Sequence, residues 1–213
     1  MNSCKDWMPL YAVTDRAWLR GRTLYEQAEE ALQGGATCLQ LREKELDEEA
    51  FLQEARELKV LCERYDVPLI INDDVEIAIK SDADGIHIGQ HDAPASLVRQ
   101  LIGPDKLLGV SAQTVKQALQ AEADGADYLG VGAVFYTGTK PDADWVSYET
   151  LQAICEAVSI PVVAIGGISR ETLPKLAGSG IDGVAVVSAI FAAPDIRAAA
   201  AELRELVKEE LNV

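Results

Sequence analysis

Aromatic side chains are scarce in this sequence. Phe, Trp and Tyr make up 6% of the 213 residues, whereas hydrophobic residues make up 48%. A chain of this length can bury a sizeable core, and that core must consist mainly of Ala, Val, Leu and Ile. These residues are typical of buried parallel strands, so the composition favours an α/β protein.

Cysteine and long apolar runs are also scarce. The four cysteines form no C-x-x-C pair, which argues against a zinc site and a disulfide framework. We therefore expect the cysteines to be small hydrophobic residues of the core. No stretch approaches the ~18 consecutive apolar residues of a membrane span. The first residues lack the basic and apolar regions of a signal peptide. We therefore expect a cytoplasmic protein with no membrane partner.

Positive charge is in short supply. Lys and Arg number 19 against 35 Asp and Glu, a net charge of −16. Such a balance argues against binding to nucleic acid or to an anionic membrane surface. If the protein binds phosphates, it must gather cations, backbone amides or a metal ion at one place.

One pattern recurs along the chain: a turn of small residues that runs into a short apolar strand. It occurs at 34–41, 82–88, 124–131 and 179–187, and further strand candidates lie between these at 9–14, 68–72, 106–111 and 161–166. The strands are followed by stretches with apolar residues three and four apart, for example at 24–32, 47–65, 114–123, 148–158 and 196–211, with Asp47 and Thr114 as candidate N-caps. Eight strand and helix alternations predict a single (β/α)₈ TIM barrel over residues 1–213. An open doubly wound sheet is the alternative.

The stretch 127–140 carries the first sign of chemistry. An apolar strand ends in Gly130 and Gly132, which allow a ligand to approach the backbone, and Thr137, Thr139 and Lys140 follow. Two hydroxyls and a cation suit phosphate oxygens. The alternative is an ordinary loop with a solvated lysine, because short motifs of this kind also match by chance.

Polar residues also end the second predicted strand. In a barrel, the active site lies at the C-terminal ends of the strands. Alternation along the chain turns Gln40, Arg42 and Lys44 to one side, and two adjacent cations suggest an anion between them. The alternative is a basic strand exit that is paired with Glu43 and Glu45.

Carboxylates follow the third and fourth predicted strands. Asn72 and Asp73 end one strand, and Asp92 lies just beyond the next. Two carboxylates beside a diphosphate are a typical Mg²⁺ site, although Asp73 could instead be a helix N-cap. We interpret His87 as a core histidine and not as a metal ligand. The hydroxyl of Ser111 is either a ligand contact or part of the next helix start.

The last two strand ends predict a second, neutral anion site. Gly166 and Gly167 follow strand seven, and Val187 and Ser188 follow strand eight. Glycines together with the N–H groups of a helix start form the usual phosphate site of a barrel.

These residues together resemble the thiamine phosphate synthase family from Tyr11 to about Ile190. The resemblance rests on the segments 40–44, 72–73, 85–90 with Asp92, 109–111, 130–135, 137–140, 165–167 and 187–188. It implies a (β/α)₈ barrel that joins 4-amino-2-methyl-5-hydroxymethylpyrimidine diphosphate to a hydroxyethylthiazole phosphate, or its carboxylated form. The products are thiamine phosphate and pyrophosphate.

The resemblance also implies a role for each matching residue. The pyrimidine diphosphate is expected to contact Gln40, Leu41, Arg42, Glu43, Lys44, Asn72, Ser111 and Lys140, of which Arg42, Lys44, Ser111 and Lys140 are the catalytic candidates. Mg²⁺, the expected cofactor, is assigned to Asp73 and Asp92. The thiazole phosphate is assigned to Thr137, Gly138, Thr139, Gly167, Val187 and Ser188. The expected partners are these phosphorylated small molecules, and a homo-oligomer is left open.

The sequence departs from the family pattern at three positions. Ala133 and Tyr136 stand where the family usually has proline, and Gly138 replaces a larger residue. None of these changes removes a ligand group. Two other functions stay open: a thiazole tautomerase, which lacks the pyrimidine diphosphate residues, and a non-catalytic sensor of thiamine intermediates.

Overall fold

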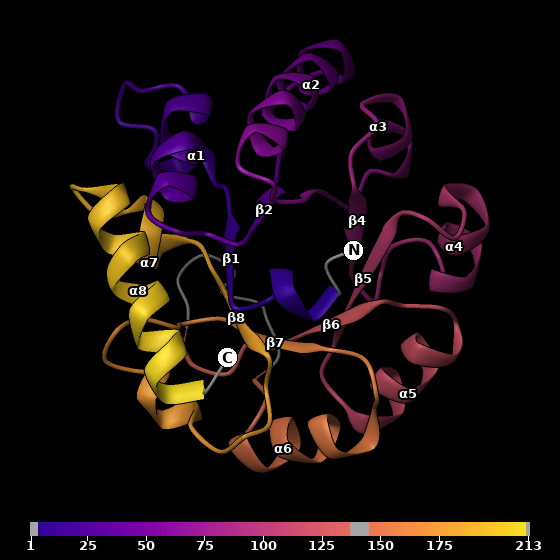
Figure 1. The fold of residues 1–213 in the computed structure, drawn as a ribbon. Coiled ribbons are helices and arrows are strands. Elements are labelled where there is room, and N and C mark those ends of the chain that lie inside the picture. Colours follow the sequence, from indigo (N-terminus) through magenta and orange to yellow (C-terminus); the bar gives the residue numbers. More distant parts are fainter. Residues whose placement is uncertain (1–3, 137–144, 212–213) are drawn as a thin grey trace.

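The strands form one closed parallel barrel with the helices around it (Figure 1). The computed structural model describes residues 4–136 and 145–211. Each strand pairs in parallel with the next along the chain, and β8 pairs with β1, which closes the barrel. The predicted (β/α)₈ fold is confirmed, and the open sheet is wrong.

All eight strands lie within the predicted segments or extend them by one residue. They are β1 (Leu10–Val13), β2 (Cys38–Leu41), β3 (Leu69–Asn72), β4 (Gly85–Ile88), β5 (Leu107–Ala112), β6 (Tyr128–Val131), β7 (Val162–Ile165) and β8 (Gly183–Val186). Their register places Asn72 beside His87 and Ser111 beside Gly130. The polar strand ends therefore belong to neighbouring strands at one end of the barrel.

The helices also follow the predicted pattern, with one difference. They are α1 (Leu24–Gln33), α2 (Glu48–Arg64), α3 (Val75–Lys80), α4 (Ala95–Ile102), α5 (Val115–Ala123), α6 (Tyr148–Ala157), α7 (Ser188–Phe191) and α8 (Ile196–Leu211), with 3₁₀ helices η1 (Cys4–Trp7), η2 (Arg16–Trp18) and η3 (Leu173–Leu176). Asp47 and Thr114 are the N-caps of α2 and α5, as predicted. The connection after β7 contains only η3, where Pro174 occupies the first turn and has no N–H to donate.

The recurrent turn has a structural reason. The aspartate before β4, β6 and β8 accepts a hydrogen bond from an N–H at the start of the preceding strand: Asp84 from Leu69 (2.8 Å), Asp127 from Leu108 (2.7 Å) and Asp182 from Val162 (2.9 Å). Asp182 also pairs with Lys5, and Asp127 pairs with Arg99. Part of the negative charge thus fixes the end of the barrel that lies opposite the polar strand ends.

Side chains that alternate along the strands form two core layers. One set packs between strands and helices and includes Leu39, Leu41 and Ile71. The other set fills the barrel and includes Tyr11, Cys38, Ile70 and Tyr128. Cys38 and Cys62 are buried, and Cys4 and Cys155 are half-buried. Within residues 4–136 and 145–211, no helix is long and apolar enough to cross a membrane.

Candidate active site

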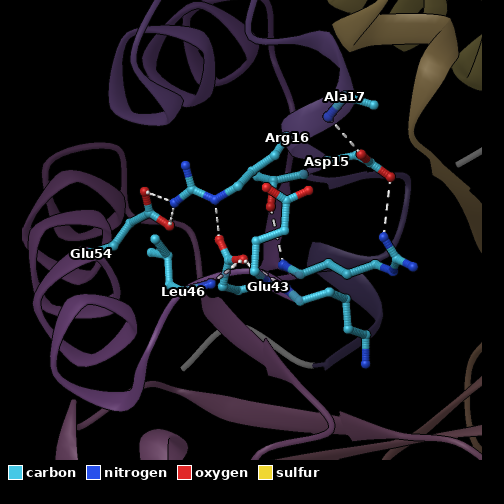
Figure 2. A network of polar contacts seen from close by, with 10 residues as sticks. Asp15, Arg16, Ala17, Glu43, Leu46 and Glu54 are labelled. Atoms are coloured by element: carbon cyan, nitrogen blue, oxygen red, sulfur yellow. Dashed lines mark hydrogen bonds and ion pairs between the residues drawn. The ribbon is translucent and has the colours of Figure 1, made fainter.

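A buried carboxylate, Glu43, organises the loop after β2 (Figure 2). Its Oε1 atom accepts N–H groups of Lys44 (2.7 Å), Glu45 (2.6 Å) and Leu46 (3.1 Å). Its Oε2 atom pairs with Arg16 from the loop after β1, and the Glu43 side chain is 1% exposed. Glu43 thus closes its own loop and ties it to the neighbouring loop.

The charge on Glu43 is held in place by these donors. Burial disfavours the charge, but the N–H groups of Glu45 and Leu46 and the Arg16 guanidinium outweigh it and lower the pKa of Glu43. Arg16 also bonds Glu54 of α2, at 2.7 and 2.8 Å. The carboxylate of Glu43 is occupied by this network. If Glu43 contacts the substrate as predicted, it therefore does so through its main-chain atoms.

The loops after β1 and β2 also fix Arg42. Its N–H donates to Oγ1 of the buried Thr14 (3.0 Å), and its Nη1 pairs with Asp15 Oδ2 (3.1 Å). Gln40 points into the barrel interior, where its Nε2 donates to Tyr11 Oη (2.8 Å). Leu41 packs in the layer beneath the helices, so its predicted ligand contact also falls to the main chain.

Lys44, Asp73 and Asp92 come together at the ends of β2, β3 and β4. Lys44 Nζ lies 2.6 Å from Asp73 Oδ2. Burial disfavours the charge on Asp73, but the hydrogen bond and charge of Lys44 outweigh it and lower the pKa of Asp73. Burial raises the pKa of Asp92, and the neighbouring Asp73 charge adds to this, although the Gly89 N–H opposes it. The structure therefore brings together the two carboxylates predicted for Mg²⁺.

The donor set fits a magnesium ion that is shared with substrate. Among the described residues, no group of three or more His, Cys, Asp or Glu side chains could hold a metal alone. Mg²⁺ usually binds one or two carboxylates and completes its shell with phosphate oxygens and water. Asp73 and Asp92 supply that minimum and leave the other positions to a diphosphate.

Asp73 is not the cap of the following helix. The N-cap of α3 is Asp74, which accepts the Ile77 N–H at 2.9 Å. Asp73 has a φ of 65°, a left-handed conformation that side chains other than Asn and Asp rarely adopt. The carboxylate of Asp73 is therefore not used as a helix cap and pairs instead with Lys44.

Ser111 is held from two sides at the end of β5. Its Oγ lies 3.0 Å from His87 Nε2, and its carbonyl accepts Gln90 Nε2 at 2.6 Å. His87 also contacts Tyr128 Oη through Nδ1, at 3.2 Å. His87 is therefore a hydrogen-bonded interior histidine, as predicted. Asn72, the register partner of His87, is a further group that lowers the pKa of Asp73.

The other half of the site is built from the backbone. Gly166 and Gly167 have φ of 97° and 65°, and Phe135 N–H donates to Gly166 O at 3.0 Å. A Cβ atom on Gly167 would lie 2.4 Å from Tyr136 O, so only glycine lets this loop meet the one after β6. Val187 and Ser188 stand at the start of α7. The predicted contacts Thr137, Gly138, Thr139 and Lys140 lie outside the described residues.

Sequence reasoning missed the loop after β1. Thr14, Asp15 and Arg16 stand at a strand end like the residues that were singled out, so the same positional rule could have found them. It also missed Tyr11 and Tyr128, which look like ordinary strand aromatics until their hydroxyls are seen to meet 2.7 Å apart.

This chain is similar to known proteins over nearly its whole length. The family described as thiamine monophosphate synthase matches residues 10–190. The thiamine-phosphate synthase of Clostridium tetani is 52% identical over 200 residues, which cover 94% of this chain and 96% of the relative. That of Chloroflexus aurantiacus is 52% identical over 203 residues, covering 95% and 93%. The structure of thiamine phosphate pyrophosphorylase from Pyrococcus furiosus superposes with a TM-score of 0.90 at 39% identity, covering 97% of this chain and 98% of that one.

Proposed function

This chain belongs to the thiamine monophosphate synthase family, and on that premise we propose how its barrel end synthesises thiamine phosphate. The activity is that of a transferase, which joins the hydroxymethylpyrimidine diphosphate to the hydroxyethylthiazole phosphate. The observation that carries this function is the family match over residues 10–190, because it spans both halves of the barrel end. The relatives above carry the synthase name, which favours synthesis over a tautomerase or a sensor.

The pyrimidine diphosphate binds on the charged half. Arg42 and Lys44 reach it from one loop, and that loop is held in shape by Glu43. Ser111 and Asn72 supply neutral polar contacts from β5 and β3. Lys140 adds a third cation from the segment after β6. Since each of the two described cations already has a carboxylate partner, the diphosphate exchanges one anion for another at a prepared position.

Asp73 and Asp92 are the residues that would hold Mg²⁺ when the diphosphate is bound. When bound, the ion would neutralise negative charge on the diphosphate oxygens as the leaving group departs. Lys44 keeps Asp73 charged, which prepares this carboxylate for a cation. Asp92 is oriented by the Gly89 N–H at 2.7 Å.

The thiazole phosphate binds on the backbone half. N–H groups are offered by Gly167 and by the start of α7 at Val187 and Ser188, and Ser188 adds a hydroxyl. The sequence assigns three further contacts to this phosphate: Thr137, Gly138 and Thr139. The residues assigned to this half include no cation. The arrangement suits a phosphate that stays intact, because the charge of such a phosphate does not change during the reaction.

The chemical step is a dissociative substitution. Pyrophosphate leaves the pyrimidine methylene carbon, the resulting cation is stabilised by its 4-amino group, and the thiazole nitrogen captures it. Arg42, Lys44 and Lys140 offset the charge on the leaving pyrophosphate, and Ser111 donates a hydrogen bond to it. Holding both substrates on one barrel end supplies the proximity, so the reaction requires no side-chain nucleophile.

The direct test is incubation of the protein with both phosphorylated substrates and Mg²⁺. We expect thiamine phosphate and pyrophosphate in equal amounts, and neither product when one substrate or the metal is omitted. Binding of both substrates without product would contradict the synthase function and favour the sensor. Rearrangement of the thiazole phosphate alone would favour the tautomerase.

A further inference from the structure

Five polar side chains form one hydrogen-bonded chain across the barrel interior. Gln40 Nε2 donates to Tyr11 Oη at 2.8 Å, and Tyr11 Oη lies 2.7 Å from Tyr128 Oη. Tyr128 Oη lies 3.2 Å from His87 Nδ1, and His87 Nε2 lies 3.0 Å from Ser111 Oγ. The chain therefore connects β2 with β5 through β1, β6 and β4, and both of its ends are predicted substrate contacts.

The barrel leaves space for this chain. Tyr11 and Tyr128 are 1% and 0% exposed. A Cβ atom on Gly109 would lie 2.2 Å from Tyr128 Cζ, and one on Gly130 would lie 2.9 Å from His87 Cε1. The glycines of β5 and β6 thus make room for the two rings, so packing holds the rings where their polar atoms meet.

Both phenol groups keep their hydrogen. Burial is the largest cause that raises the pKa of Tyr11 and of Tyr128 well above the ordinary range, and for Tyr11 the neighbouring phenol adds to it. Each hydroxyl can therefore donate one hydrogen bond and accept others.

The Gln40 amide sets the direction of donation. An amide nitrogen only donates, so Tyr11 accepts from Gln40 and gives its own hydrogen to Tyr128. Tyr128 then gives its hydrogen to His87 Nδ1, which leaves the ring hydrogen on Nε2, facing Ser111 Oγ. If Tyr128 instead donated to Tyr11, the hydroxyl hydrogen of Tyr11 would have to bond the sulfur of Cys38, which is a weak acceptor.

We propose that Tyr11 and Tyr128 are positioning residues that fix His87 as an Nε2–H donor to Ser111, so that the Ser111 hydroxyl turns its hydrogen outward to the pyrimidine diphosphate. Only the last step, the contact of Ser111 with substrate, rests on the proposed function. The tautomer of His87 is a property of the protein without substrate, so it can be tested separately.

The test of the tautomer is nuclear magnetic resonance of protein with ¹⁵N-labelled histidine. The chain has two histidines, and H91Q assigns their signals. At about pH 8, where an ordinary histidine is neutral, we expect hydrogen on Nε2 of His87 in the wild type. In Y128F we expect a mixture of tautomers, and Y11F serves as the second variant if Y128F does not fold. Hydrogen on Nδ1 in the wild type, or an unchanged tautomer in a folded variant, overturns the proposal.

The test of the functional step is a double-mutant cycle with Ser111. We expect Y128F to lower turnover about tenfold, the effect of one hydrogen bond, and to add no loss in a protein that already carries S111A. The control is Y148F, which removes an exposed hydroxyl bonded to Ala177 O at 2.9 Å and should leave turnover unchanged. Additive losses from Y128F and S111A overturn the proposal. Absence of thiamine phosphate in the wild type would instead overturn the proposed function and leave the tautomer result standing.

Discussion

The two halves of the barrel end are built on opposite plans. The half from β1 to β5 consists of charged side chains in pairs, Arg42 with Asp15 and Lys44 with Asp73. The described part of the half from β6 to β8 consists of glycines and helix-start N–H groups around Gly167 and Ser188. The difference teaches how a chain of net charge −16 can bind two phosphorylated molecules. Under the proposed function, the paired cations would lie where charge changes during the reaction, and the neutral backbone would lie where it does not.

The largest expected effect removes a carboxylate from the charged half. Asp73→Ala should lower turnover by about 10² to 10³, the usual loss when a group that stabilises developing charge is removed. The matched control is Asp66→Ala, because Asp66 is exposed and has a similar left-handed φ, 54° against 65° for Asp73. The thermal stability of Asp73→Ala should fall no further than that of this control. Turnover and melting curves of both variants provide the measurement. Unchanged turnover in Asp73→Ala would contradict the assignment of the metal to this half.

Lys140 tests whether the charged half extends to the segment after β6. Lys140→Ala should lower turnover about 10²-fold with little change in melting temperature, because the residue is assigned to the departing pyrophosphate and not to the core. Lys116→Ala, an exposed lysine of α5, is the control. If both lysine variants keep wild-type turnover, Lys140 has no part in the reaction.

Arg16 tests whether the charged half depends on its buried anchor. Arg16→Ala leaves Glu43 buried without its guanidinium partner, which should cost roughly 3 kcal/mol, the lower end for a broken buried pair, because three N–H donors remain. The melting temperature should fall by about 6 to 12 °C. Arg22→Ala, which breaks the more exposed Arg22–Glu30 pair, should cost less than about 1 kcal/mol. Equal losses in the two variants would mean that Glu43 is not an anchor.

The pH dependence of Glu43 provides an independent check. Since folding lowers its pKa, Glu43 contributes stability that is fully present above its unfolded pKa of about 4.3. That contribution is lost as the pH falls through the folded pKa. The difference in unfolding free energy between wild type and Glu43→Gln, from urea titrations, should therefore shrink on acidification below about pH 4.3. A difference that stays constant through this range would contradict the assignment.

A smaller effect is expected on the backbone half. Gly167→Ala adds a Cβ atom 2.4 Å from Tyr136 O at a φ of 65°, and the loops after β6 and β7 must separate. Affinity for the thiazole phosphate should fall about tenfold while binding of the diphosphate stays unchanged. Gly103→Ala has a φ of 77° and nothing within 4 Å of the new atom, so it carries the backbone strain alone, about 1 kcal/mol. Calorimetry that finds both ligands weakened alike would mean that the two halves are not separate.

Local sequence patterns predicted the elements and the strand ends but not the side-chain partners. The caps Asp47 and Thr114 and the alternation of Gln40 with Leu41 depend on neighbours within a few residues, so they can be seen in the sequence. Arg16 and Glu43 are 27 positions apart, and Tyr11 and Tyr128 are 117 apart. The pairing of β1 with β2 brings the first pair together, and closure of the barrel brings the second pair together. The role of Glu43 as a loop anchor therefore became visible only in the structure.

The difference between the halves is tested most directly by titration calorimetry of each substrate with Mg²⁺ and with EDTA. Asp73 and Asp92 repel each other and a diphosphate, since unit charges ~4 Å apart interact by several kcal/mol at intermediate dielectric. Mg²⁺ should therefore tighten binding of the pyrimidine diphosphate about tenfold or more, and the diphosphate should tighten Mg²⁺ by the same factor. Affinity for the thiazole phosphate should change by less than about twofold. Equal metal dependence for the two ligands would contradict the placement of the metal or the division of the two phosphate sites.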